Sequence, residues 1–191
     1  MKIILASSSR YRQNLLKKII PDFEVHSPDI DESRYNQESP AELANRLAYE
    51  KTRAVAQRQP EALIIGSDQV AWLDNTQLCK PLNKQAAIQQ LVACQGKTAQ
   101  FYTGICLLNS KTGKRQTSVE RYETTFRTLS TEQITAYVNR EPALNCAGGF
   151  KMEGLGIALF EKIRGDDPNS LIGLPLIRLI NMLENEGISV L

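Results

Sequence analysis

Histidine is almost absent from this chain of 191 residues, which contains His26 alone. One histidine excludes zinc sites built from several histidines and argues against nucleophiles that a histidine base activates. His26 ends a predicted short strand, where a structural or surface position is the better interpretation. Catalysis by this chain would therefore depend on carboxylates, lysines, arginines and a hard metal ion.

Cysteines and long apolar runs are also scarce. The four cysteines, at positions 79, 94, 106 and 146, form no CxxC pair and no metal-ligand spacing, so we interpret them as reduced and mostly packed. No stretch approaches the length of a membrane span, and no apolar signal-peptide core follows Met1. We therefore expect a cytoplasmic protein with no membrane partner.

Neither sign of charge dominates, since 23 Lys and Arg residues oppose 21 Asp and Glu residues. The basic residues alternate with acidic ones, so we expect no stable nucleic-acid binding. Hydrophobic residues make up 42% of the chain, as in an ordinary globular protein. The length suffices for one large core or for two lobes that share a sheet. Because no repeat or clear linker divides the sequence, we predict a single domain over residues 1–191.

Strand and helix patterns are mixed along the chain. Strands are predicted at 3–6, 23–26, 62–72, 98–108 and 115–127, and helices at 10–20, 40–59, 83–94, 130–139 and 170–185. A hairpin turn is expected at 74–75, and a longer hairpin joins the strands on either side of 111–114. This arrangement favours an α/β protein with a mixed sheet.

Three serines, Ser7, Ser8 and Ser9, follow the first strand and precede Arg10 and Arg12 at the start of a helix. Small hydroxyl groups and free backbone N–H groups at a helix N-terminus suit a phosphate, and the arginines add positive potential. The Walker A pattern GxxxxGK[ST] is absent from the chain. A strand–serine–helix turn is also an ordinary helix cap, so both interpretations stay open.

Lys51 interrupts the apolar stripe of the helix at 40–59. The stripe consists of Ala44, Leu47, Ala48 and Val55. Lys51 lies three residues beyond Ala48 and four beyond Leu47, so it falls on the same inward face. An ammonium group aimed at the core usually meets an anion. Alternatively, the lysine stem follows the edge of the stripe and its charge reaches water.

Asp68 breaks the pattern of the strand at 62–72. Strand alternation places it on one face with Ile64, Gly66, Val70 and Trp72. Aspartate is depleted in strands and is rarely buried unless it is paired or bound to a cation. Gly66 would let another backbone or a ligand approach closely. We favour a functional role, with a strand that ends at Gly66 and a turn capped by Asp68 as the alternative.

Weaker signals lie elsewhere in the chain. Asp29, Asp31 and Glu32 supply oxygen ligands suited to a hard cation, although acidic loops are usually only solvated. Lys80 ends the predicted hairpin after Asp68, where it could reach an anion near that carboxylate.

A glycine-rich run at 147–156 lacks the strand-to-helix setting of a dinucleotide fingerprint but suggests that the backbone wraps closely around something flat or charged.

Taken together, the charged residues predict a site in which Arg12, Lys51 and Lys80 surround a polyphosphate. Asp68 and an upstream carboxylate would then organise Mg²⁺ and water for hydrolysis of a phosphoanhydride.

Several short blocks follow one another in a fixed order: 5–12 (LASSSRYR), 31–32 (DE), 46–51 (RLAYEK), 65–70 (IGSDQV), 80–81 (KP), 102–104 (YTG), 146–154 (CAGGFKMEG) and 173–175 (GLP). Through these blocks the sequence resembles the Maf family of nucleoside triphosphate pyrophosphatases, over essentially its whole length. The resemblance implies a mixed α/β fold, also similar to ITPases, with a long bent central sheet flanked by helices in two lobes. It also implies that a homodimer is an expected assembly.

The resemblance further implies hydrolysis of a nucleoside triphosphate between its α and β phosphates. On this basis the catalytic carboxylate is Asp68, which also binds the metal together with Glu32. The substrate-binding residues implied by the resemblance are Ser7, Arg12, Lys51 and Lys80. The cofactor implied is a divalent cation, Mg²⁺ or Mn²⁺.

Three positions distinguish the branches of the family. Tyr11, Gln69 and Glu153 resemble the branch that hydrolyses 7-methyl-GTP rather than the branch that acts on dTTP and UTP. An aromatic face can stack on a cationic methylated purine, and a carboxylate can accept hydrogen bonds from the guanine edge. Preference for dTTP and UTP stays an alternative, as does a nucleotide-binding regulator of cell division.

Overall fold

The computed structural model describes residues 1–191 as helices around a seven-stranded mixed sheet. The strands are β1 (Lys2–Leu5), β2 (Glu24–Val25), β3 (Ala62–Leu73), β4 (Thr76–Leu78), β5 (Thr98–Asn109), β6 (Arg115–Phe126) and β7 (Phe160–Arg164). Their order is β2-β1-β3-β5-β6-β7, with β4 paired to β3. β1 pairs in parallel with β2 and β3, whereas β4 and β7 pair antiparallel with β3 and β6. The predicted mixed α/β fold is therefore confirmed.

Six α-helices and two short 3₁₀ segments complete the secondary structure. They are α1 (Arg10–Leu16), α2 (Pro40–Ala56), α3 (Lys84–Ala93), α4 (Thr131–Arg140), η1 (Ala147–Gly149), η2 (Leu155–Leu159), α5 (Pro168–Ile172) and α6 (Leu176–Glu184). None of these helices has both the length and the apolar character that crossing a membrane requires.

The residues form two compact units. Unit 1 contains residues 1–69, 103–120 and 167–191, and unit 2 contains residues 70–102 and 121–166. β3, β5 and β6 each contribute residues to both units. A compact unit is not by itself an independently folding domain, so the single domain expected over residues 1–191 stays a prediction.

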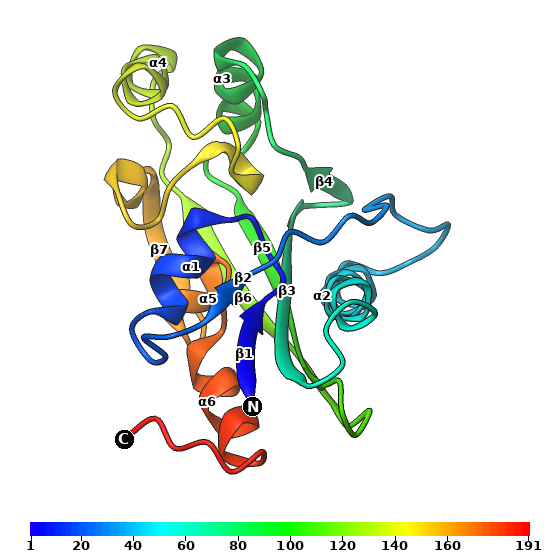
Figure 1. The fold of residues 1–191 in the computed structure, drawn as a ribbon. Coiled ribbons are helices and arrows are strands. Elements are labelled where there is room, and N and C mark those ends of the chain that lie inside the picture. Colours follow the sequence, from blue (N-terminus) through cyan, green and yellow to red (C-terminus); the bar gives the residue numbers. More distant parts are fainter. The chain divides into compact units, whose positions relative to one another are not determined.

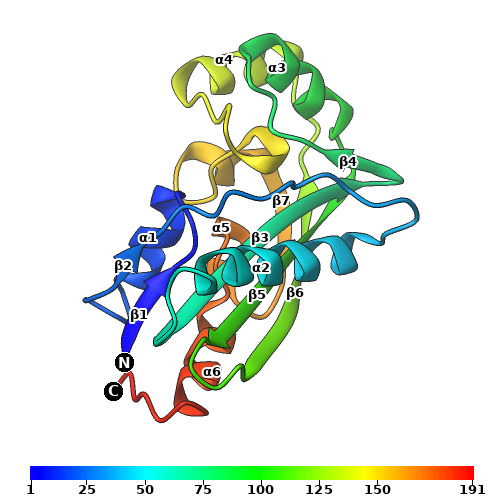
Figure 2. The same cartoon turned by 45° about the vertical axis from the view of Figure 1, so that its right-hand side comes forward.

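Unit 1 buries both faces of its part of the sheet. On one face, side chains of β1, β3 and β5 pack with α1 and α6 in a cluster that includes Leu5, Leu16, Ile65 and Leu179. On the other face, α2 covers the same strands, with Val55 beside Ile64 and Ala48 beside Cys106. Figures 1 and 2 show α2 on the side of β3 opposite to α1 and α6. Alternate residues of β3 therefore face different helices.

Two glycines bring α2 very close to the sheet. A Cβ atom added to Gly66 of β3 would lie 2.5 Å from the carbonyl oxygen of Ala48. One added to Gly104 of β5 would overlap the carbonyl group of Ala44. The close approach expected at Gly66 is therefore that of a helix backbone. It brings Lys51, on the same face of α2, within reach of β3.

Replacing Gly104 with alanine is expected to destabilise unit 1 by about 3 kcal/mol, because the methyl group would displace the α2 backbone. Urea unfolding followed by circular dichroism would measure this loss. Gly113→Ala is the control, since Gly113 has a φ of +76° and open space around it and should lose only about 1 kcal/mol. Equal losses in the two variants would contradict tight packing of α2 at Gly104.

Four phenylalanines form the aromatic centre of unit 2. Phe150 packs edge-to-face against Phe101, Phe126 and Phe160, with ring centroids 4.8 to 6.1 Å apart. Gly148 precedes Phe150 in the chain with a φ of +82°, and a Cβ there would meet the Phe150 and Phe101 rings. The glycine-rich run thus packs its backbone against aromatic rings.

Several element boundaries differ from the predictions. The helix expected at 170–185 is two helices, because Gly173 has a φ of +126° and Pro175 follows it. The first helix ends at Leu16 and not at residue 20, with turns before Pro21. β7 was not predicted, because a five-residue strand with three charged residues (FEKIR) gives little apolar signal.

Candidate active site

Lys51 lies between two carboxylates in unit 1. Its Nζ is 2.5 Å from Oδ1 of Asp68 and 2.7 Å from Oε1 of Glu32. Lys51 and Asp68 are only 5% and 8% exposed, whereas half of the Glu32 side chain is exposed. α2 contributes the lysine, β3 the aspartate, and the loop before α2 the glutamate. One cation therefore holds together acids that are far apart in the sequence.

Both structural alternatives for these residues are wrong. The Lys51 ammonium group does not follow the helix edge to water, since it is buried and ion-paired. β3 does not end at Gly66 but continues to Leu73, so Asp68 is a strand residue and caps no turn. A buried carboxylate in a central strand is costly unless a charge compensates it, and Lys51 supplies that charge.

The serine-rich turn lies between β1 and α1. Ser9 caps α1 by accepting a hydrogen bond from the Arg12 N–H, so the capping interpretation holds for this serine. Ser7 is buried, and its Oγ accepts bonds from the Ser9 N–H at 3.1 Å and from Arg12 Nη1 at 3.5 Å. The two expected phosphate-binding residues, Ser7 and Arg12, are thus adjacent.

Arg12 is fixed at its other side by the turn between α5 and α6. Its Nε donates to the carbonyl oxygen of Gly173 at 2.8 Å, and Ser67 Oγ donates to the same oxygen at 2.9 Å. Burial lowers the pKa of the Arg12 guanidinium, and the charges of Asp68 and Glu32 oppose this change. Arg12 therefore lies within electrostatic reach of the acids that Lys51 joins.

Ser67 is a site-supporting residue that sequence reasoning missed. It is fully buried, and its Oγ lies 2.8 Å from the carbonyl oxygen of Gly104 as well as 2.9 Å from that of Gly173. It thus links β3 to β5 and to the turn that holds Arg12. A serine at the centre of a long apolar strand was the signal that could have revealed it.

The residues assigned to substrate choice have different surroundings. Tyr11 is half-buried on α1. The amide nitrogen of Gln69 donates to Ser170 O at 2.8 Å, Leu171 O at 3.0 Å and Thr103 Oγ1 at 3.1 Å, which ties α5 to the sheet. Lys80 and Glu153 are exposed residues of unit 2. Lys80 follows β4, and Glu153 lies between η1 and η2. Their roles stay predictions.

The donor set near Lys51 fits a hard divalent cation. Glu32 and Asp68 already converge on one positive charge, the Lys51 ammonium. Asp29 and Asp31 are exposed, and Asp31 accepts a hydrogen bond from the Ser33 N–H at 2.9 Å. No cluster of three His, Cys, Asp or Glu side chains is placed to enclose a metal. Mg²⁺ typically takes one or two carboxylates and completes its shell with water and phosphate oxygens.

Comparison with known proteins gives a consistent assignment. A family profile described as Maf-like protein matches residues 2–186. The chain is 52% identical to a 7-methyl-GTP pyrophosphatase of Alcanivorax borkumensis, over 98% of this chain and 95% of that protein. It is 50% identical to a 7-methyl-GTP pyrophosphatase of Nitrosococcus oceani, over 99% and 95% of the two chains.

A solved structure resembles the chain in fold alone. The Ham1 protein of Staphylococcus aureus superposes with a TM-score of 0.56 and 16% identity, and the match covers 97% of this chain and all of that one. The family profile and the full-length relatives agree: this protein belongs to the Maf family.

Proposed function

We propose that this protein hydrolyses 7-methyl-GTP to 7-methyl-GMP and diphosphate, and so removes a modified nucleotide from the cytoplasmic pool. The observation that carries the reaction is the buried Asp68–Lys51 pair with Glu32 beside it. The choice of substrate is supported by the names of relatives that share about half of their residues with this chain over nearly their full length.

In the proposed reaction Asp68 accepts a proton from water. The water oxygen attacks the α-phosphorus, and the bond from that phosphorus to the oxygen bridging the α and β phosphates breaks. The bridging oxygen leaves with diphosphate. Asp68 suits the role of base because β3 fixes its backbone and the Lys51 ammonium group holds its carboxylate in place through one oxygen, Oδ1.

Cationic side chains stabilise the charge that develops on the leaving diphosphate. An ammonium group has three N–H donors, so Lys51 can retain Asp68 and still donate to a phosphate oxygen. Arg12 is anchored through Nε, which leaves the outer edge of its guanidinium to face a phosphate beside Ser7. Lys80 is proposed as a further phosphate-binding cation.

Glu32 and Asp68 are proposed to hold one divalent cation, Mg²⁺ or Mn²⁺. When bound, such a cation polarises the phosphate oxygens and lowers the pKa of a bound water. Glu32 suits this role because its half-exposed carboxylate can leave Lys51 for a metal at little cost in solvation. Removal of divalent cations by a chelator would therefore stop hydrolysis.

Substrate choice can be tested with a panel of 7-methyl-GTP, GTP, dTTP and UTP at saturating Mg²⁺. We expect the wild-type protein to release diphosphate from 7-methyl-GTP with the highest kcat/KM. Glu153→Gln should lower this preference about tenfold, because an amide replaces a carboxylate that accepts from the guanine edge. Glu161→Gln is a matched control, since Glu161 is also an exposed acid of unit 2.

Each other outcome has a definite meaning. Higher kcat/KM for dTTP and UTP would retain the reaction and reverse the assignment of Tyr11, Gln69 and Glu153. An unchanged preference in Glu153→Gln would remove Glu153 as a base-reading residue. No diphosphate from any nucleotide would favour the alternative of a nucleotide-binding regulator.

A further inference from the structure

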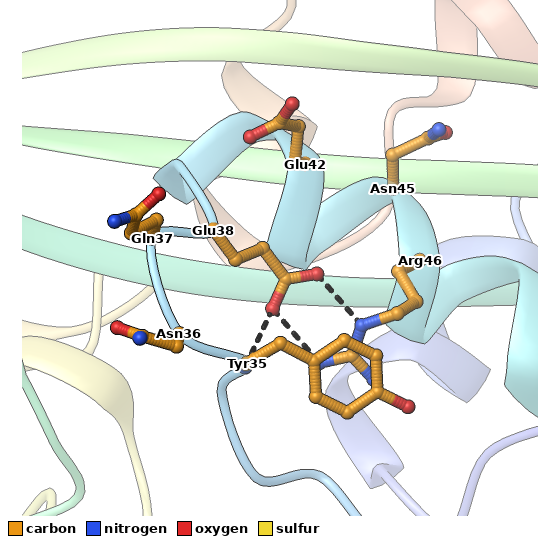
Figure 3. A pocket seen from close by; sticks show the side chains of 7 residues that line it. All are labelled: Tyr35, Asn36, Gln37, Glu38, Glu42, Asn45 and Arg46. Carbon is orange, nitrogen blue, oxygen red and sulfur yellow. Dashed lines mark hydrogen bonds and ion pairs between the residues drawn. The ribbon is translucent and has the colours of Figure 1, made fainter.

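Arg46 connects α2 to the loop that precedes it. Its Nε and Nη2 donate to the two carboxylate oxygens of Glu38 at 2.7 and 2.9 Å. Nη2 also donates to the carbonyl oxygen of Ser33 at 2.8 Å, and Nη1 to Glu50 at 3.0 Å. The guanidinium lies 3.8 Å from the centre of the Tyr35 ring (Figure 3). A single side chain thus contacts both ends of the segment 33–38.

The loop itself adds one hydrogen bond to the Glu38 carboxylate and one to the Glu38 backbone. The Tyr35 N–H donates to Glu38 at 3.1 Å, and Arg34 Nε donates to the Glu38 carbonyl oxygen at 2.8 Å. Figure 3 shows the Glu38 carboxylate between the Tyr35 backbone and the Arg46 guanidinium. Glu38 and Arg46 are 9% and 15% exposed in their side chains, so solvent screens this pair only partly.

The electrostatics agree with a strong bidentate ion pair between Arg46 and Glu38. Hydrogen bonds from Arg46 hold the pKa of Glu38 below its ordinary value, and the Glu38 carboxylate raises the pKa of Arg46. Two parallel N–H···O bonds fix direction as well as distance. Arg46 therefore fixes the orientation of the loop, and a lysine could not reproduce that geometry.

Glu32 immediately precedes the segment that Arg46 holds. Ser33, whose carbonyl oxygen accepts from Arg46, is its next neighbour in the chain. Glu32 is half-exposed and forms an ion pair with Lys51. Without the Arg46 contacts, Glu32 would be carried by a polar loop that contributes few buried side chains.

We propose that Arg46 is a positioning residue that keeps the Glu32 carboxylate beside Lys51 and Asp68 and thereby sets the affinity for the divalent cation. The inference rests on the proposed function, because Glu32 is assigned to the cation there. Arg46 touches no reacting atom. Its effect passes through the Ser33 carbonyl group and the Glu38 carboxylate to the backbone of Glu32.

The experiment compares Arg46→Ala and Glu38→Ala with Glu50→Ala. Glu50 is the Arg46 partner on α2 itself, so its removal leaves the loop contacts intact. We expect the first two variants to raise the Mg²⁺ concentration that gives half-maximal diphosphate release about tenfold. This is the lower end of the range of losses in metal affinity that follow removal of residues that orient metal ligands. The nucleotide KM, measured at saturating Mg²⁺, should stay within twofold. Glu50→Ala should resemble the wild type.

Two further measurements separate positioning from general loss of structure. Hydrogen exchange should accelerate in residues 32–38 of Arg46→Ala while β3 and the second half of α2 stay protected. In a Glu32→Ala background, Arg46→Ala should not change the Mg²⁺ requirement further, because both substitutions then remove the same contact.

The proposal is overturned if Arg46→Ala leaves the Mg²⁺ requirement unchanged, or if its effect adds to that of Glu32→Ala. Acceleration of exchange throughout unit 1 would also overturn it, since Arg46 would then be a general stabilising residue. If the wild-type protein releases no diphosphate from any nucleotide, the proposed function fails instead. The exchange of residues 32–38 then decides by itself whether Arg46 holds this segment.

Discussion

Asp68→Asn is expected to lower kcat for diphosphate release by about 10²- to 10⁴-fold, the range for loss of a general base. Asparagine has nearly the same shape as aspartate but cannot accept a proton from water at neutral pH. The buried position of Asp68 on β3 leaves no other carboxylate of that strand to replace it. Single-turnover measurement with 7-methyl-GTP would test this without interference from product release.

The same variant should remain folded. Lys51 keeps its contact with Glu32, so no buried ammonium group is left without an acid. Asp29→Asn is the matched control, because Asp29 is an exposed acid of the loop that carries Glu32, and it should retain full activity. If Asp68→Asn retained more than a tenth of the wild-type kcat with an unchanged melting temperature, Asp68 would not be the base.

Lys51→Met is expected to lower the free energy of unfolding by about 3–5 kcal/mol, the range for removing one partner of a buried ion pair. Methionine preserves most of the lysine stem, so the loss reflects charge more than packing. Asp68, only 8% exposed, would be left without its cation, whereas half-exposed Glu32 can turn to water. Urea unfolding with a chelator present would measure the loss without a contribution from bound metal.

Two variants make this prediction specific. Lys97→Met removes an exposed lysine whose partner Asp74 is also exposed, so it should cost less than about 1 kcal/mol. The double variant Lys51→Met/Asp68→Asn should recover most of the stability, because no buried charge stays unpaired, and should still be inactive. Equal losses for Lys51→Met and Lys97→Met would show that the buried pair contributes no more than a surface pair.

Local chemistry explains the features that could be predicted from the sequence. The Ser39–Glu42 pair forms a complete capping box at the start of α2, and the Ser130–Gln133 pair does so at α4. The hairpin turn at 74–75 joins β3 to β4 as expected. These signals depend on residues within a few positions of one another, so they can be recognised without the rest of the fold.

The unusual placement of two charges was also visible in the sequence. Lys51 within an apolar stripe and Asp68 within an apolar strand each violate a strong pattern, and such violations point to paired or functional groups. The sequence by itself thus determined the mixed α/β class, the family resemblance and two members of the candidate site. It did not determine their partners, because pairing depends on which face of α2 rests on which face of β3.

Only the tertiary structure decided how the site is assembled. Lys51 meets Asp68 because glycines at 66 and 104 let α2 approach the sheet, and no local pattern reports that distance. The contacts of Arg46 were likewise invisible, since an arginine within a helix looks like any solvated charge until the preceding loop folds back onto it. Long-range contacts of this kind arise from the packing of whole elements, and single residues and their spacing do not encode them separately.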